Sequence, residues 1–497
     1  MRAFANSTKL GGTVSALLLT LLLAQPSGAA HAASARPATS GDASAYPIAD
    51  QLATDVTGSD VYRHLQALQQ IADTSDGNRG YDKVGFTRSV RYVSGLMKAA
   101  GYHVVEQSVP YTDFDVQKEQ LVVSGAGEGD GDTPVLMTRF TPSTGPAGID
   151  APLVSLPTGR TGCNSADYDG VPAAGAIVVL ARAACGYGVQ QQVAAGAGAR
   201  AFLLYYPTPS PENIYRLIGF TPPAYTIPVA SVSQREGEIL ARAAAGGGVR
   251  VHLTLRAQDV PRTTVNLVAE TAGGDPDNVV LVGGHLDSVT EGPGINDNGS
   301  TAATVLQTAL ELAPYQRTVT NKVRFVWWGA EELVDIGSDY YVSQLTSTQR
   351  QQITAVVNGE LIASPNYARF VWDSGSGGGH VIADLFAAYF DSKGLPYDRE
   401  SPDDIGSDHL PFEAAGIPVA GIDGGNLNVK TPAQQERYGG EAGQMFDHCY
   451  HQACDRLDDI NREALDDNAP AMAWVLGRLA TYDEDVRAAA QGTGRLQ

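Results

Sequence analysis

The sequence has few cysteines, and beyond its first residues it has no long apolar segment. Only four of its 497 residues are cysteine, and their spacing does not resemble that of a zinc ribbon. Past the N-terminal region no run approaches the roughly 20 apolar residues that a membrane-crossing helix needs. No internal repeat of about 20 to 50 residues is present, which excludes a solenoid or propeller. We therefore expect a globular protein without a membrane span.

Positive charge is also scarce. The chain has 34 Lys and Arg against 55 Asp and Glu, a formal net charge of −21 at pH 7. Such a charge repels phosphate backbones and anionic lipid, so we expect neither nucleic acid nor a membrane as a partner. The apolar content of 43% excludes a disordered or collagen-like chain. At this length, two folded units are the expectation.

The N-terminus has the pattern of a secretory signal peptide. Arg2 and Lys9 precede an apolar run over residues 14–24, and small residues with Ala-His-Ala and Ala-Ser-Ala sites follow. The run is too short for a retained membrane anchor. We predict a signal peptide over residues 1–33, a spacer or pro-segment over 34–45, and a secreted, extracellular protein.

Secretion places the four cysteines in an oxidising environment, where disulfides persist. Cys449 and Cys454 are close enough in sequence for a local bridge. Cys163 and Cys185 are then left to pair with each other. The sequence therefore predicts two disulfides.

Hydrophobic periodicity predicts an α/β protein with an insertion. Ser59 is expected to cap a helix, a second helix is expected over 85–99, and residues 102–109 alternate like a strand. After Pro110 the chain is rich in Gly, Ala and Pro, which indicates short strands up to about residue 262. Strands (266–270, 279–283, 323–328, 353–357, 417–422) then alternate with helices (301–312, 338–345, 381–390, 464–479). We expect one domain from residues 46–111 and 263–497, and a β-rich insert over 112–262.

Histidine and carboxylate residues follow several of the predicted strands. His285 and Asp287 follow a continuous apolar strand, and Asp297 lies in a polar turn before the next helix. A second strand ends at the adjacent pair Glu331 and Glu332. Open α/β sheets bind ligands beyond the carboxyl ends of their strands. Two adjacent carboxylates repel each other in a dry site unless a cation lies between them or one is protonated.

A pair of zinc ions explains this pattern. Two metals about 3.5–4 Å apart can hold a nucleophile and a developing oxyanion, while one Glu of an adjacent pair ligates metal and the other serves as base. Glu360 follows another strand, and His451 lies between the two cysteines of the proposed loop bridge. His409 is left open between a role in supporting the site and a purely structural one.

The segments around these residues resemble peptidase family M28, the dizinc peptidases, and in particular its secreted Streptomyces-type aminopeptidases. The motifs that carry the resemblance are Gly77-Asn78-Arg79, the segments around His285 and Asp297, Glu331-Glu332, Ser364-Pro365-Asn366 and Cys449 to Asp455. The resemblance implies an open mixed sheet flanked by helices, the zinc-peptidase fold, with two Zn²⁺ per chain. It covers about residues 59–110 and 263–480.

The resemblance also implies the role of each residue. One zinc is expected on His285 and Glu360, the other on Glu332 and His451, and Asp297 is expected to bridge both. Glu331 is the expected general base for a metal-bound water, Tyr450 is expected to help hold the tetrahedral intermediate, and Asp287 is expected to orient His285.

The insert resembles a protease-associated (PA) domain. The resemblance rests on Gly162-Cys163, Asp167-Tyr168, residues 176–180 and 195–199, and Ile227-Pro228-Val229. It implies a domain beside the active-site entrance without catalytic residues of its own. A carbohydrate-binding or partner-binding module is the alternative.

Two positions depart from the family pattern. The family has Asp where this chain has Glu360, and Arg where it has Gly406. Both positions serve substrate recognition in the family, and Asp404 is a candidate to retain part of that role. We predict an aminopeptidase, expected to be a monomer, that acts on peptides and proteins. The alternatives are a dizinc carboxypeptidase or amide hydrolase, or an inactive secreted binding protein.

Overall fold

The computed structural model describes residues 46–218, 225–483 and 486–491. The predicted signal peptide (1–33) and spacer (34–45) lie outside the described residues. No described helix is long and apolar enough to cross a membrane.

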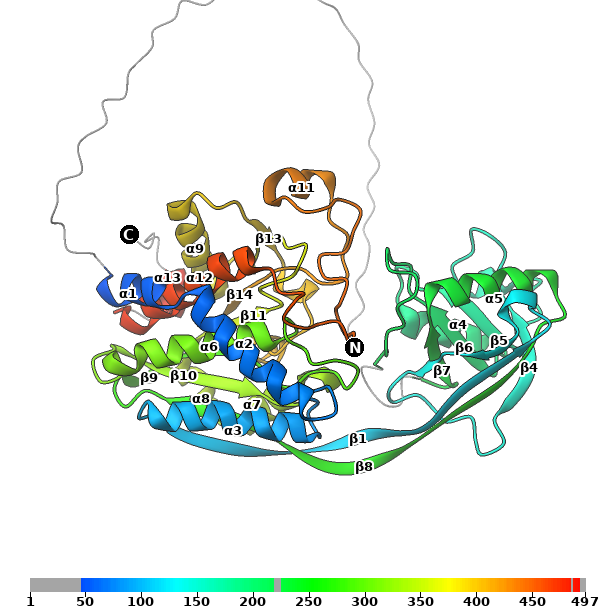
Figure 1. Ribbon diagram of the computed structural model, residues 1–497, viewed down its shortest axis with the longest axis horizontal. Helices are drawn as coiled ribbons and strands as arrows, with labels where there is room; N and C mark the ends of the chain where they lie inside the picture. Colours follow the sequence, from blue (N-terminus) through cyan, green and yellow to red (C-terminus); the bar gives the residue numbers. More distant parts are fainter. Residues whose placement is uncertain (1–45, 219–224, 484–485, 492–497) are drawn as a thin grey trace, which may run out of the picture. The chain divides into compact units, whose positions relative to one another are not determined.

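Four parallel strands form the centre of the main sheet (Figure 1). In spatial order they are β14 (Val419–Asp423), β11 (Ile353–Glu360), β9 (Asp275–His285) and β10 (Asn321–Trp328). Antiparallel strands extend both sides, with β12 (Phe370–Trp372) and then β13 (Asp398–Glu400) beyond β14, and β8 (Arg250–Glu270) beyond β10. The predicted mixed open sheet is therefore confirmed. Its central strands are apolar on both faces, as parallel strands covered by helices are.

Two layers of helices cover the sheet, because alternate strand residues enter different cores. Val280 and Val282 of β9 pack in one core with residues of α2 (Gly58–Asp73), α3 (Val84–Ala99), α6 (Gly299–Leu312), α9 (Gly377–Lys393) and α12 (Arg462–Thr481). Val279 and Leu281 pack in another with residues of α7 (Ile336–Gln344) and α10 (Leu410–Ala414). The remaining helices of this part are α1 (Pro47–Asp55), α8 (Ser347–Gln352), α11 (Pro432–Tyr438) and α13 (Val486–Gln491).

The predicted start of α2 is wrong by two residues. The side chain of Thr57, not Ser59, caps the helix, because Thr57 Oγ1 accepts the main-chain N–H of Asp60 at 3.2 Å. Ser59 lies within the first turn. Either residue type can cap a helix, so periodicity alone did not distinguish them.

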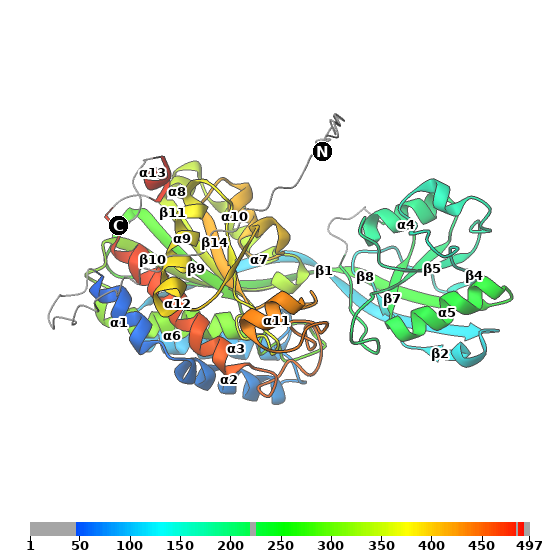
Figure 2. The ribbon, with the colours of Figure 1, turned by 90° about the horizontal axis from the view of Figure 1, so that it is seen from above.

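One strand runs without interruption through Pro110, where the sequence predicted a break. β1 (His103–Ser124) pairs antiparallel with β8 along its length, from His103 opposite Glu270 to Ser124 opposite Arg250 (Figures 1 and 2). Pro110 lies within it, opposite Thr263. A proline is tolerated because β1 has a partner on one side only at that point. The predicted break at Pro110 is therefore wrong, whereas the short strands predicted beyond it are present between residues 131 and 232.

The insert continues the main sheet beyond β8 with a run of short, mostly parallel strands. β4 (Ile149–Val154) pairs with the start of β8 and with β5 (Ile177–Ala181), and β6 (Ala201–Tyr205) and β7 (Val229–Val232) follow in parallel. Short β2 (Gly131–Thr133) and β3 (Leu136–Met137) pair with β1 and β7. Helices α4 (Tyr187–Gly196) and α5 (Gln234–Gly246) pack against these strands. The buried apolar residues of the insert form two cores.

Candidate metal centre

The carboxyl ends of neighbouring parallel strands bring the predicted ligands together. His285 is the last residue of β9, and Glu360 is the last residue of β11, the strand beside it. Glu331 and Glu332 follow β10 in the short turn η4 (Glu331–Leu333). The turn enters through Ala330, whose φ of 62° is in the left-handed region. Strain of this kind is concentrated at functional sites.

Asp297 lies between the two histidines. Its Oδ1 is 3.3 Å from Nε2 of His285, and its Oδ2 is 3.1 Å from Nε2 of His451. Oε2 of Glu360 is 3.7 Å from the same nitrogen of His285, and Oε2 of Glu332 is 3.2 Å from that of His451. The five side chains therefore form two sets of three that share Asp297.

These separations suit tetrahedral zinc. Bonds of about 2.0–2.1 Å in a tetrahedron place two ligand atoms roughly 3.3 Å apart. Oε1 of Glu332 is buried without a hydrogen-bond partner among the described residues. Ligand atoms of His285, Asp297 and Glu332 lie within 4.8 Å of one another. Imidazole and carboxylate are zinc ligands, so the donor set fits the metal.

Asp455 holds the loop that carries Asp297. Its carboxylate accepts the main-chain N–H of Asn296 at 2.6 Å and that of Asp297 at 3.0 Å. The side chain of Asn296 in turn donates to Asp447 at 2.7 Å. Asp455 was not among the predicted site residues, although its place directly after Cys454 in the family motif was a signal.

Asp287 contacts His285 mainly through its main chain. Nδ1 of His285 lies 3.1 Å from the carbonyl oxygen of Asp287 and 3.7 Å from its carboxylate. That carboxylate accepts the main-chain N–H groups of Glu331 and Glu332, both at 3.3 Å. Asp287 therefore also positions the glutamate pair, a role that the sequence did not predict.

Glu331 lies beside the set formed by His285, Asp297 and Glu360, with Oε2 3.6 Å from Nε2 of His285. Burial raises the pKa of its carboxyl group well above the usual range, and nearby Asp335, Glu360 and Asp408 raise it further against the lowering effect of His285. Burial alone would lower the pKa of His285, but Glu331, Glu360 and Asp297 raise it well above its ordinary value. The site thus concentrates negative charge that a cation would offset.

His409, which the sequence left open, packs away from the ligands. Its Nε2 lies 2.9 Å from the carbonyl oxygen of Pro402, and its ring lies 4.5 Å from that of Trp372. It is fully buried and does not line the pocket over the ligands. The structure supports the structural alternative for His409.

Asp404 and Gly406, which bear on the predicted recognition of the substrate amine, lie in the segment before α10. Asp404 ends the short turn η5 (Pro402–Asp404), and its side chain lies outside the described residues. Gly406 is exposed and lines the pocket. A Cβ built at Gly406 meets no atom within 4 Å, so a side chain has room there.

A disulfide closes the loop that presents His451. Cys449 and Cys454 are bonded, as predicted, and His451 between them has a φ of 58°. The ring of Tyr450 stacks on that of His451 at 3.8 Å. Burial raises the pKa of Tyr450 well above its ordinary value. The predicted Cys163–Cys185 bridge is also present.

The insert forms a second wall of the pocket over the ligands, with lining residues that the sequence did not predict individually. The pocket has a volume of 440 Å³, and it is lined on the metal side by residues that include His285, Asp297, Glu331 and Tyr450. Residues of the insert line it as well: Arg182, Tyr187, Tyr206, Tyr215, Arg216, Leu217 and Ile218. No local motif marked these residues, because the fold alone brings them to the pocket.

Two families match parts of the chain. Residues 266–476 match the model of peptidase family M28, and residues 149–240 match that of the PA domain. An aminopeptidase of Pseudomonas aeruginosa is 34% identical over 465 residues, covering 87% of this chain and 83% of the relative. Leupeptin-inactivating enzyme 1 of Streptomyces exfoliatus is 47% identical over 218 residues, 43% of this chain and 49% of that protein.

A solved structure shows the same fold. The aminopeptidase from Aneurinibacillus sp. strain AM-1 superposes with a TM-score of 0.66 at 23% identity, covering 88% of this chain and 98% of that chain. At this identity the likeness concerns the fold. The match of residues 149–240 to the PA domain identifies the insert in this chain.

Proposed function

Because this chain belongs to peptidase family M28 and is a zinc-dependent aminopeptidase, we propose that it holds two zinc ions per chain and removes N-terminal residues from peptides outside the cell. The observation that carries the proposal is the position of Asp297. Its two carboxylate oxygens lie 3.3 Å and 3.1 Å from the Nε2 atoms of two different histidines. A carboxylate shared in this way suits a bridge between two metals.

The ligand assignment follows from the two sets. We assign His285 and Glu360 to one zinc, Glu332 and His451 to the other, and Asp297 to both. When bound, zinc polarises the substrate carbonyl and makes water acidic enough to attack at neutral pH. Asp287 and Asp455 hold the glutamate turn and the Asp297 loop in place.

Glu331 is the proposed general base. Its carboxylate lies beside His285 and is assigned to neither zinc, so it can accept the proton of the attacking water and return it to the leaving amine. Tyr450, which lines the same pocket, is the proposed donor of a phenolic O–H to the developing oxyanion. The free amino group of the substrate is expected near Glu331 and Glu360.

A dizinc carboxypeptidase or amide hydrolase remains the second candidate function. The observation that favours it is the pair of departures at Glu360 and Gly406, because both lie where the family recognises the substrate amine. Secretion is supported by the two disulfides, which persist in oxidising compartments. For the domain division we propose a peptidase unit over 46–111 and 263–497 and a PA insert over 112–262.

The test is hydrolysis of matched peptides that differ only at the N-terminus. Mature protein is assayed on one peptide with a free amine and on its N-acetylated form, before and after chelation and zinc restoration. We expect cleavage of the free peptide alone, loss of activity on chelation and about two zinc per chain by elemental analysis. Preference for the acetylated peptide would favour the alternative, and a single tightly held metal would contradict the two-zinc assignment.

A further inference from the structure

Two arginines of the insert line the active-site pocket, and their surroundings differ. Arg216 is half-buried and paired twice, at 2.9 Å with Glu119 and at 2.8 Å with Glu291. Glu291 belongs to the loop between His285 and Asp297, so this arginine connects the insert to the metal-bearing segment. Its charge is already satisfied. It serves as a structural link rather than as a ligand for substrate.

Arg182 has no such partner. Its side chain is exposed and lines the pocket, and its guanidinium lies 4.9 Å from the centre of the Tyr206 ring. Among the described residues, no carboxylate lies within ion-pair distance of it. A guanidinium stacked on an aromatic face keeps its donors free for a planar anion.

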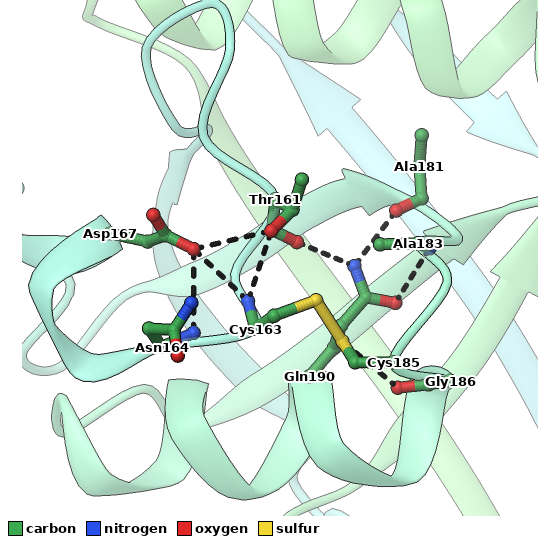
Figure 3. Close-up of a disulfide and its surroundings, with 9 residues drawn as sticks. All are labelled: Thr161, Cys163, Asn164, Asp167, Ala181, Ala183, Cys185, Gly186 and Gln190. Carbon is green, nitrogen blue, oxygen red and sulfur yellow. Dashed lines mark hydrogen bonds between the residues drawn. A yellow bond between two sulfur atoms is a disulfide. The ribbon is translucent and has the colours of Figure 1, made fainter. Parts of the chain in front are cut away.

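The backbone that carries Arg182 is held on both sides. Arg182 directly follows β5, and its N–H donates to the carbonyl of Tyr205 at 2.9 Å. The buried amide of Gln190 donates to the carbonyl of Ala181 at 2.9 Å and accepts the N–H of Ala183 at 3.2 Å (Figure 3). Gln190 also donates to the carbonyl of Thr161 at 2.7 Å, close to the first half-cystine of the Cys163–Cys185 bridge. The guanidinium therefore extends from a fixed point.

The chemistry of the pocket identifies what Arg182 can bind. The metal side of the pocket is acidic, with Glu331, Glu332, Asp335 and Glu360 among its lining residues, so it suits the amino end of a peptide. The opposite wall then meets the part of the substrate beyond the scissile bond. The anionic groups of a peptide are its C-terminal carboxylate and its acidic side chains. Carboxylate is the anion that a guanidinium fork binds with two parallel hydrogen bonds.

We propose that Arg182 binds a substrate carboxylate on the C-terminal side of the scissile bond and so makes the enzyme prefer peptides with a negative charge there. This inference rests on the aminopeptidase function proposed above. It assigns the PA insert a direct part in substrate selection, with Tyr206 as a positioning residue beneath the guanidinium. The carboxylate can come from a short peptide's C-terminus or from an acidic side chain.

The experiment uses the zinc-loaded full chain and four peptides that begin with the same residue. Leu-Gly-Gly is compared with Leu-Gly-Gly-amide, which isolates the C-terminal carboxylate. Leu-Gly-Glu-amide is compared with Leu-Gly-Gln-amide, which isolates an acidic side chain. Each kcat/KM is measured for wild type, Arg182→Gln, Arg182→Lys and a control, Arg242→Gln, which replaces an exposed arginine of α5 that does not line the pocket.

We expect wild type to favour at least one charged peptide by about tenfold over its neutral partner, since charge-assisted hydrogen bonds are stronger than neutral ones and partial exposure weakens them. Arg182→Gln should reduce that ratio to about one. Arg182→Lys should retain part of the ratio, and Arg242→Gln all of it. Equilibrium binding of the same peptides to the Glu331→Gln variant, with and without Arg182→Gln, should show the same difference.

The outcomes separate the two proposals. Cleavage of all peptides with a wild-type ratio near one, or a ratio that survives Arg182→Gln, would overturn the inference and leave the aminopeptidase function intact. No cleavage of any free peptide by the zinc-loaded protein would overturn the proposed function, and this inference with it. A ratio confined to the first pair identifies the C-terminus, and one confined to the second pair identifies a side chain.

Discussion

The hydroxyl of Ser407 donates a hydrogen bond to Oε1 of Glu360. The other oxygen, Oε2, is the one that faces His285, at 3.7 Å. Ser407 is itself held by the amide of Asn358, which donates to its oxygen at 2.9 Å. The longer carboxylate at this position is therefore anchored at one oxygen, while the other remains free for metal.

Restoring the family residues at positions 360 and 406 should improve recognition of a free amine. Glu360→Asp shortens the side chain and shifts the oxygen that meets the substrate ammonium by about 1 Å, and errors of that size can cost about 10²-fold. Gly406→Arg adds a cation where the structure has room for a side chain. We expect the double variant to raise kcat/KM on a free peptide and to leave that on its acetylated form unchanged. No gain on the free peptide would favour the amide hydrolase alternative.

Glu331→Gln should separate catalysis from metal binding. Glutamine keeps the shape of the side chain but cannot accept the water proton, and general-base help is typically worth about 10²–10⁴-fold. We expect kcat to fall by that amount while zinc content, measured on the same preparation, stays at the wild-type level. Glu332→Gln is the matched control, because it should lower the zinc content as well. Near-normal turnover of Glu331→Gln would exclude its role as base.

Opening the short disulfide should weaken one metal more than it weakens the fold. The Cys449–Cys454 bridge closes a loop of a few residues, and the chain-entropy model gives such a loop roughly 2 kcal/mol. His451 inside it has a left-handed backbone that a freed loop need not keep. We expect the double Cys→Ser variant to remain folded and to lose one zinc at lower chelator concentration. Replacing Cys163 and Cys185 instead should leave zinc retention unchanged.

The sequence predicted those parts of the site that lie next to its strongest patterns. The apolar run over residues 279–282 marks a buried strand, and a polar residue at the end of such a strand has few explanations other than a ligand site. For this reason the amino-acid sequence alone was enough to predict that His285, the Glu331–Glu332 pair and Glu360 lie close together, as they do in the structure. The same reasoning failed at Pro110, because proline disfavours an inner strand but is tolerated at an edge, and local sequence does not specify which strand is an edge.

Other parts of the site depend on distant contacts. Asp455 supports Asp297 across 158 residues, and Arg182 reaches the pocket from the insert. Arg182 stands in no pattern that a single sequence distinguishes from a surface turn, and the family motif that includes Asp455 does not specify what its carboxylate contacts. The main-chain role of Asp287 also depends on the path of its loop, because its carboxylate turns toward η4 instead of toward the imidazole.

Because His409 is buried, we expect it to make the free energy of unfolding depend on pH. Replacing this one residue should remove its part of that dependence. Desolvation lowers the pKa of this imidazole from 6.5 to about 4, against smaller opposing effects from the carbonyl of Pro402 and from Asp403. Between these two pKa values the unfolded chain binds a proton that the folded chain does not. The free energy of unfolding therefore falls as the pH drops through 6.5 and levels off below about 4.

From pH 7 to pH 5 the contribution of His409 is about 2 kcal/mol, at 1.36 kcal/mol for each pKa unit. His409→Gln can still donate to the carbonyl of Pro402 but takes up no proton, so wild type should lose about 2 kcal/mol more than the variant over this range. Urea unfolding followed by tryptophan fluorescence measures this, since all four tryptophans belong to the peptidase part of the chain. His103→Gln, at an exposed position of β1, is the control and should keep the wild-type dependence. If wild type and His409→Gln lose the same free energy of unfolding over this range, His409 adds nothing to the acid sensitivity of the fold. That result would show that the folded protein takes up a proton at His409.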